Sequence, residues 1–318
     1  MLQVERYMSI KEIIMKKTLL FISAVLCLSA CCGNQKQQVM ARYVPERADD
    51  FVWENEQIAY RAYGKALEGE TLSPGFDVWV KDSSRLCANE WYEMATNKTG
   101  SYHKYHRGKD CYKVAVSLGA GASSPVVDGN FVFPTTNYRS WEIVKETPTE
   151  VVFSLSYPEW EVDGHKVALT KTITVTPNTW FCKCEDSYTG DFDKLTVAAG
   201  LLRHSIKEND TVRSQVVASA AVENGVVLWE EASDQTQEKE DGLVGVALYM
   251  PAADSISLGL DVNDVVKANS LANHAVAYKT IANGEKIEYW FGSCWSKGDI
   301  KTFDEWVKAT NELIANKK

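Results

Sequence analysis

Short segments in which apolar and polar residues alternate run through most of the chain. The clearest of them are residues 58–63, 76–81, 151–157 and 167–176. A period of two is typical of a strand with one buried and one polar face. Within residues 76–81, Asp77, Trp79 and Lys81 share the polar face, and within residues 58–63 that face carries Arg61 and Tyr63. Further strands are predicted at residues 180–185, 195–201, 212–222, 226–230, 243–250, 255–260, 275–281 and 286–294.

Only two stretches have the pattern of a helix. Residues 87–95 predict a short one, and a longer one begins after Thr302, which forms a capping-box pair with Glu305 ahead of an apolar stripe. Turn dipeptides such as Asp163-Gly164 and Asn224-Gly225 separate several strands. The pattern predicts an all-β domain over residues 43–318, a large antiparallel β-sandwich with a C-terminal helix.

The N-terminal segment has the features of an export signal. Lys16 and Lys17 precede an apolar run at residues 19–28, which is too short to span a bilayer, and Leu-Ser-Ala then leads into Cys31. This junction resembles a bacterial lipobox, which implies that Cys31 is lipidated and that Met15 is the true start. We therefore expect a signal peptide at residues 1–30, a tether at residues 31–42 and a lipid anchor in the outer membrane of the cell envelope.

The charge of the chain excludes some classes of partner. Removing residues 1–30 takes four basic and two acidic side chains from totals of 34 and 43, which leaves a net charge of −11. So acidic a protein is a poor nucleic-acid binder, although a local basic site for an acidic ligand remains compatible with it. The cysteine spacing has no metal-knuckle pattern, and we predict neither a metal site nor a cofactor.

The candidate chemistry is concentrated in residues 101–112, which read SYHKYHRGKDCY. Tyr102, His103 and His106 are its candidate catalytic groups, because imidazole titrates close to neutral pH and phenol donates a proton. The segment lacks the bulky apolar residues of a buried strand, which favours a loop at the rim of a site. A solvated polar loop without a catalytic role is the alternative.

Four residues outside this segment break the pattern around them. Lys171 lies on the apolar face of its strand, so that it requires either a carboxylate partner or a wet cleft. Arg139 and Trp141 place a guanidinium beside an indole, which suits a sugar carrying a carboxylate or a surface cation–π contact. His204 follows a strand and is either a second titratable group of the site or a structural histidine.

Several sequence blocks resemble one protein family. They include FVWENEQIAYRAYG at residues 51–64, FDVWVK at residues 76–81, Tyr102-His103 with His106, LGAG at residues 118–121 and YWFG at residues 289–292. Together they are similar to an uncharacterised domain family of Bacteroidetes lipoproteins, associated with polysaccharide-utilisation loci for uronic-acid-containing glycans. The resemblance implies a galactose-mutarotase-like β-supersandwich.

The resulting prediction is a carbohydrate-active lipoprotein that acts on an acidic oligosaccharide or polysaccharide. A polysaccharide lyase working by β-elimination is favoured, with His103 as the base and Tyr102 or His106 as the acid. The predicted substrate contacts are Asn55, Arg61, Trp79, Lys81, Arg139, Trp141, Lys171 and His204. A glycoside hydrolase, a non-catalytic sugar-binding lipoprotein and an assembly component of the glycan machinery are the alternatives.

Overall fold

The computed structural model describes residues 36–318, apart from 69–71, 83–84, 210, 233–240 and 260–272. The predicted signal peptide and Cys31 lie outside the described residues. Residues 38–318 form one compact unit. Its first strand, β1 (Val39–Val44), includes residues 39–42, which were assigned to the tether, because Val39 and Ala41 pack in the core. The folded body therefore begins four residues before the predicted boundary at Tyr43.

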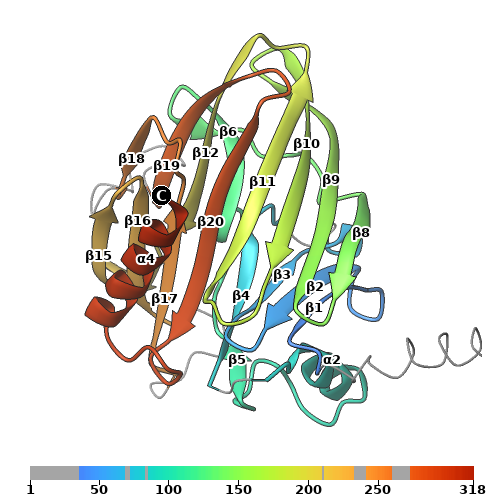
Figure 1. The fold of residues 1–318 in the computed structure, drawn as a ribbon, viewed down its shortest axis with the longest axis vertical. Coiled ribbons are helices and arrows are strands. Elements are labelled where there is room, and N and C mark those ends of the chain that lie inside the picture. The colour runs from blue at the N-terminus through green and yellow to red at the C-terminus, as the bar shows by residue number, and fades with distance from the viewer. Residues whose placement is uncertain (1–35, 69–71, 83–84, 210, 233–240, 260–272) are drawn as a thin grey trace, which may run out of the picture. The chain divides into compact units, whose positions relative to one another are not determined.

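An eight-stranded antiparallel sheet forms one layer of the fold (Figure 1). Its order is β15-β16-β17-β20-β11-β10-β9-β8. The strand bounds in that order are Val216–Val222, Gly225–Glu231, Leu243–Tyr249, Lys286–Trp295, Phe181–Gly190, His165–Val175, Glu150–Val162 and Ser140–Thr147.

Two five-stranded sheets form the facing layer. One has the order β1-β2-β3-β4-β5, in which β2 to β5 span Asp50–Asn55, Ala59–Ala62, Phe76–Lys81 and Gly108–Asp110. The other has the order β18-β19-β12-β6-β7, with bounds Ser255–Ser257, His274–Ala282, Lys194–Leu202, Ala120–Val127 and Asn130–Phe131. A bridge from Phe76 to Gly119 connects these two sheets. The predicted all-β sandwich is confirmed.

Aromatic side chains fill much of the space between the layers. Trp53 and Phe76 come from the first small sheet, and Phe153 and Phe291 come from the large one. Their ring centroids lie between 5.1 and 6.4 Å apart in the pairs that join Trp53 to the other three. Rings at these separations add directional contacts to the hydrophobic burial that holds the layers together.

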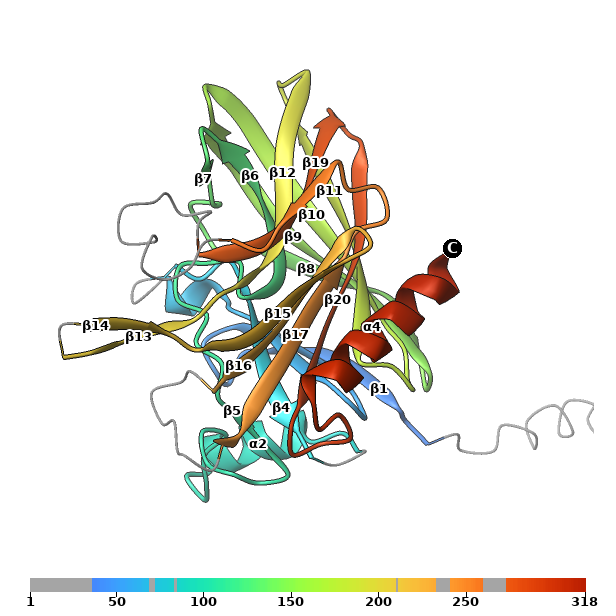
Figure 2. The same cartoon turned by 90° about the vertical axis from the view of Figure 1, so that its left-hand side faces the viewer.

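Two helices cover outer faces of the sheets, and a two-stranded ribbon projects away from the body (Figure 2). Helix α2 (Ala88–Thr96) packs on the outer face of β1–β5, and helix α4 (Phe303–Lys317) packs against β15, β16 and β17. The capping box predicted for Thr302 and Glu305 is present at the start of α4. The other elements are a short 3₁₀ helix, η1 (Lys65–Leu67), and a ribbon of β13 (Ser205–Glu208) with β14 (Thr211–Ser214). Within the described residues, no helix is long and apolar enough to cross a membrane.

Candidate functional site

The outer face of the β1–β5 sheet carries a buried group of charges. The alternation predicted for β3 and β4 places Arg61 and Asp77 directly opposite each other, and Trp79 opposite Asp110 of β5. Asp50 reaches the same place from the start of β2. We refer to Asp50, Arg61, Asp77 and Asp110 as the Arg61 cluster.

Arg61 holds the three carboxylates of this cluster together. Its Nε donates to Asp77 Oδ2 at 2.9 Å, and one Nη donates to Asp110 Oδ2 at 3.0 Å. The other Nη lies 3.6 Å from Asp50 Oδ2. Burial raises the pKa of Asp50, although the positive charges of Arg61 and Arg47 counteract part of that rise. One guanidinium thus fixes three carboxylates that come from three different strands.

Three aromatic rings enclose the Arg61 guanidinium. Its central carbon lies 4.8 Å from the ring centroid of Tyr63, 4.9 Å from that of Trp79 and 5.5 Å from that of Tyr102. The Tyr102 ring stacks on Trp79 with centroids 4.8 Å apart. Burial and the nearby Asp77 raise the pKa of Tyr63 well above its usual value. The rings exclude water and strengthen the electrostatic contacts of the cluster.

The loop of residues 101–112 covers the cluster and returns to the sheet as β5. Gly108 has a φ of +154° and lies so close to Val80 that a Cβ would come within 2.1 Å of the Val80 carbonyl oxygen. Glycine therefore lets β5 pair with β4 at this point. The backbone N–H of Asp110 donates to the Tyr102 carbonyl at 2.7 Å, which anchors the loop on the strand. The loop bends rather than running extended, since Lys104 N–H donates to the Ser101 carbonyl.

His103 stands at the boundary between this cluster and solvent. Its side chain is 34% exposed, and its Nδ1 lies 3.6 Å from Asp110 Oδ2. Asp110 in turn accepts from Arg61. The His103 imidazole thus has solvent on one side and, on the other, a buried carboxylate that Arg61 holds in place.

His106 points to a different partner. Its Nε2 lies 2.8 Å from Glu90 Oε1 on α2, and the hydrogen bond lowers the pKa of Glu90. The indole Nε1–H of Trp91 donates to the His106 carbonyl at 2.8 Å. His106 therefore links the loop to α2, and its half-exposed side chain remains accessible from solvent.

Six of the predicted substrate contacts prove to be buried, which corrects their assignment as sugar contacts. They are Asn55, Arg61, Trp79, Lys81, Lys171 and His204. Lys81 Nζ donates to Glu54 at 2.9 Å, and the same carboxylate accepts the backbone N–H groups of Cys87 and Ala88 at the start of α2. Lys81 therefore stabilises the docking of α2, and Arg61 and Trp79 lie beneath His103 and Tyr102.

The other buried residues belong to structural networks elsewhere. Lys171 Nζ lies 2.6 Å from Asp186, so its partner is a carboxylate in the core and not a wet cleft. His204 lies between Glu230 and the Lys113 carbonyl. Burial opposes a charge on His204, but Glu230 outweighs that effect and raises its pKa. His204 is thus a structural histidine, the alternative left open by the sequence.

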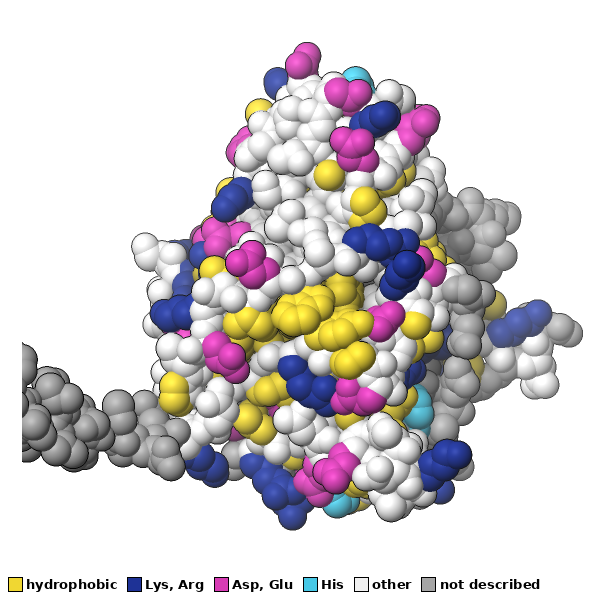
Figure 3. Space-filling view, turned by 90° about the vertical axis from the view of Figure 1, so that its right-hand side faces the viewer, with side chains coloured by type: hydrophobic (Ala, Val, Ile, Leu, Met, Phe, Trp, Pro, Cys, Tyr) yellow, Lys and Arg dark blue, Asp and Glu magenta, His cyan; other side chains and the backbone are white. Residues whose placement is uncertain are grey.

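Arg139 and Trp141 lie at the surface, but in a separate cluster. Arg139 makes a bidentate ion pair with Glu68, and Trp141 is 42% exposed and stacks on Tyr43 at 5.5 Å. Figure 3 shows hydrophobic side chains gathered on the face that carries β8. None of the described contacts joins Arg139 to His103, so the structure does not bring the predicted catalytic and carboxylate-binding groups into direct contact.

Sequence reasoning missed Arg47, which belongs to the site. Its Nε donates to the Tyr102 hydroxyl at 3.1 Å, and one Nη lies 3.4 Å from Asp50. It is a partly exposed cation beside the catalytic candidates. The polar run PERADD at residues 45–50 is a turn signal between two strands, but nothing in it indicates which distant residues the turn contacts.

No group of three or more His, Cys, Asp or Glu side chains in the described part of the chain is arranged to hold a metal ion. All five cysteines described there are buried.

Comparison with known sequences identifies the family of this chain. Residues 30–317 match the model of DUF4861, a domain of unknown function. The chain belongs to the DUF4861 family. A relative of this DUF4861 chain, the uncharacterized protein P7 of Formosa agariphila, is 27% identical over 285 residues, which is 86% of the chain. The chain spans 66% of the length of P7.

Some solved structures are distantly similar to the DUF4861 chain. A protein assigned as a kojibiose phosphorylase from the human microbiome has a TM-score of 0.44 at 10% identity, over 89% of the chain and 36% of that protein. The GH36 α-galactosidase AgaB of Geobacillus stearothermophilus has a TM-score of 0.38 at 9% identity, over 80% and 41%. Heparinase III has a TM-score of 0.32 at 9% identity, over 84% and 37%. At these TM-scores the likeness carries no inference about activity.

Proposed function

We propose that this DUF4861 chain is a carbohydrate-active enzyme that cleaves an acidic, uronate-containing glycan by β-elimination at the Arg61 cluster. The observation that carries the proposal is the half-exposed His103, whose Nδ1 lies 3.6 Å from the buried Asp110 carboxylate. Because Asp110 is held by Arg61, its position relative to the imidazole is fixed before substrate arrives.

The reaction requires a base, an acid and a counter-charge. His103 takes the proton at C5 of the uronate, and the electron pair of that C–H bond forms the C4–C5 double bond as the C4–O bond breaks. We assign the proton for the leaving oxygen to His106, which is half-exposed, because Tyr102 is buried and its hydroxyl accepts from Arg47. Arg47, partly exposed, is the cation for the substrate carboxylate.

Hydrolysis fits this site less well. Glycoside hydrolysis uses two carboxylic groups on either side of the scissile bond. The carboxylates of the Arg61 cluster are buried and bound to one guanidinium, so they do not flank a sugar. A non-catalytic sugar-binding role is the second candidate, because the exposed ring of Trp141 stacks on the partly buried Tyr43, and Arg139, two residues before Trp141, is a surface cation paired with Glu68.

The deciding experiment compares His103→Ala with His165→Ala, an exposed histidine in the hairpin between β9 and β10. Each variant is incubated with uronate oligosaccharides, while the ultraviolet absorbance of the unsaturated product and the new reducing ends are followed. General-base catalysis contributes about 10²–10⁴-fold, so His103→Ala should lower turnover by that factor and His165→Ala should not. New reducing ends without the absorbance would indicate hydrolysis, and saturable binding with neither signal would indicate a binding protein.

We also propose that the enzyme is attached to the cell envelope through lipid on Cys31. The proposal rests on residues 16–31, where a basic start, a short apolar run and Leu-Ser-Ala lead into that cysteine.

A further inference from the structure

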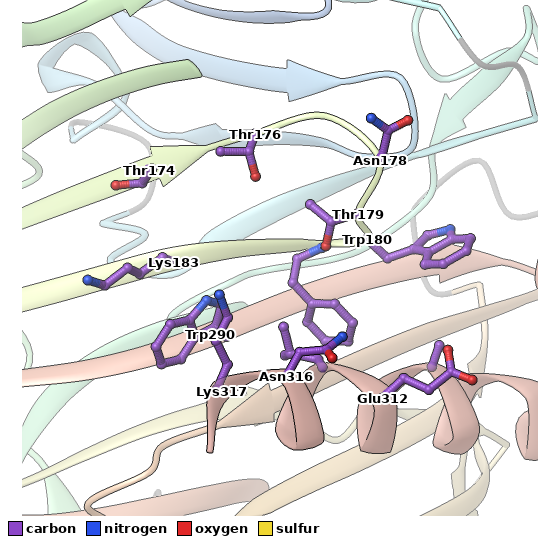
Figure 4. A pocket seen from close by; sticks show the side chains of 13 residues that line it. Thr174, Thr176, Asn178, Thr179, Trp180, Lys183, Trp290, Glu312, Asn316 and Lys317 are labelled. Carbon is purple, nitrogen blue, oxygen red and sulfur yellow. The ribbon is translucent and has the colours of Figure 1, made fainter. Parts of the chain in front are cut away.

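A groove separate from the Arg61 cluster lies between α4 and the turn that joins β10 to β11 (Figure 4). It has a volume of about 380 Å³. Its aromatic groups are Trp180, Phe181 and Trp290, and its polar groups include Thr176, Asn178 and Asn316. A smaller recess of about 170 Å³ shares Trp180 with it. Indole rings bordered by amides and hydroxyls are a composition suited to a sugar chain.

The turn at residues 176–180 is held rigidly in place. The Asn55 side-chain amide donates to the carbonyls of Thr176 and Thr179, both at 2.8 Å. Glu56 accepts the backbone N–H of Asn178, and Ser293 N–H donates to the Trp180 carbonyl at 3.2 Å. Because both ends of the turn are anchored, the wall of the groove is formed without a ligand, which lowers the entropic cost of binding one.

Two ammonium groups lie over a single indole at one end of the groove. Lys317 Nζ is 5.1 Å and Lys183 Nζ is 5.8 Å from the ring centroid of Trp290. Lys183 forms ion pairs with two carboxylates, since its Nζ lies 2.6 Å from Glu288 Oε2 and 3.6 Å from Glu185 Oε2. Lys317 has no carboxylate partner among the described residues, so its charge is available to a ligand.

The charge that the groove offers to a ligand comes from one residue. Two lysines, Lys183 and Lys317, and one acidic residue, Glu312, line the groove, but Lys183 is already paired with Glu288 and Glu185. The ammonium of Lys317 therefore favours an anionic ligand group over a neutral one. A carboxylate next to the Lys317 ammonium would form a charge-assisted hydrogen bond.

We propose that this groove is a second, non-catalytic binding site for an oligosaccharide that carries carboxylates. The sugar rings lie along the partly exposed Trp180, the buried Trp290 forms the floor beneath the two ammonium groups, and a uronate carboxylate binds Lys317. The proposal shares its ligand class with the proposed function, but it rests on groups that take no part in proton transfer. Such a site holds the polymer while the Arg61 cluster acts on another part of it.

The test measures binding at the tryptophans themselves. The protein is labelled with 5-fluorotryptophan in a His103→Ala background, which stops turnover, and Trp180→Phe and Trp290→Phe variants assign their two ¹⁹F resonances. Trigalacturonate is titrated in as the acidic probe, and its methyl ester as the matched neutral probe. We expect both resonances to move saturably with the acid, and the ester to bind about tenfold more weakly, because one charge-assisted hydrogen bond is lost.

Lys317→Ala and Lys318→Ala form the matched pair of variants. Lys318 is the next residue, it is exposed, and it pairs with Glu223 outside the groove lining. Lys317→Ala should weaken trigalacturonate about tenfold, whereas Lys318→Ala should leave its affinity within twofold of the parent. Equal affinity of both variants, or resonances that do not move with either probe, would overturn the proposal.

The outcomes also separate this proposal from the proposed function. If the wild-type protein turns over substrate but the ¹⁹F resonances of Trp180 and Trp290 do not move, only the proposal of a binding groove is refuted. Binding at the groove without any turnover would refute the lyase alone.

Discussion

Replacing Arg61 with methionine tests whether the Arg61 cluster is the electrostatic centre of the β1–β5 sheet. Methionine keeps an unbranched chain between Trp79 and Tyr102 but removes the guanidinium. Asp77 and Asp110 then lose partners at 2.9 and 3.0 Å while they remain buried, whereas Asp50 keeps Arg47 at 3.4 Å. Removing one partner of a buried ion pair typically costs about 3–5 kcal/mol.

The matched control is Arg139→Met. Arg139 also binds a carboxylate through two hydrogen bonds, but its pair with Glu68 lies at the surface, where such contacts contribute about 0–1 kcal/mol. For a domain of this size each kcal/mol corresponds to roughly 2–4 °C in Tm. Thermal unfolding followed by circular dichroism should therefore show a loss of roughly 6–20 °C for Arg61→Met and a few degrees at most for Arg139→Met.

The pH dependence of this difference provides a second readout. A buried carboxyl without a counter-charge has a folded-state pKa above its unfolded value, because burial disfavours the charged form. The Arg61→Met variant should therefore be most stable at low pH, where its buried carboxyls are protonated, and should lose stability as the pH rises through that raised pKa. Burial already raises the pKa of Asp50 in the native protein. The gap in Tm between Arg61→Met and wild type should narrow from pH 7 to pH 4. A variant that loses no more stability than Arg139→Met would refute the assignment of Arg61 as the centre of the cluster.

Two further predictions concern other parts of the chain. The protonated His204–Glu230 pair stabilises the fold fully below the unfolded pKa of about 6.5, and this stabilisation is lost as the pH rises through the raised folded pKa. In His204→Gln, Tm should therefore decline less between pH 6 and 9 than it does in the wild type. An unchanged slope of Tm against pH would exclude His204 as the source of the decline. Cys31→Ser should release the protein from the membrane fraction of the expressing cells, and retention there would disprove the lipid anchor.

Alternation along the sequence predicted the parts of the site that depend on single strands. It placed Arg61 of β3 and Tyr63, the residue after β3, on one face, and Asp77 and Trp79 on one face of β4. Arg61, Asp77 and Trp79 prove to lie on the same side of one sheet. Strand β4 occupies the predicted residues 76–81. A pattern of period two specifies which way a side chain points, so these features required no knowledge of distant partners.

Other features depend on contacts between distant residues, which the sequence does not reveal. β2 was not predicted because all six of its residues are buried, including Asp50, Glu54 and Asn55. Their polar groups are paired with distant residues, namely Arg61, Lys81 and backbone groups of α2 and of the β10–β11 turn. Because these partners are distant in the sequence, the pattern did not show that Arg61 and Lys81 are buried, and both were predicted to contact sugar.

The hairpin from β2 to β3 has a consequence for engineering this protein. Three successive residues make different contacts there. Glu54 accepts a backbone N–H at the start of α2, Asn55 donates to the β10–β11 turn, and Glu56 accepts the backbone N–H of Asn178. A peptide inserted at this hairpin would disturb α2 and the groove wall together. The β9–β10 hairpin is a better place for a tag, because a Cβ at Gly164 would meet nothing within 4 Å.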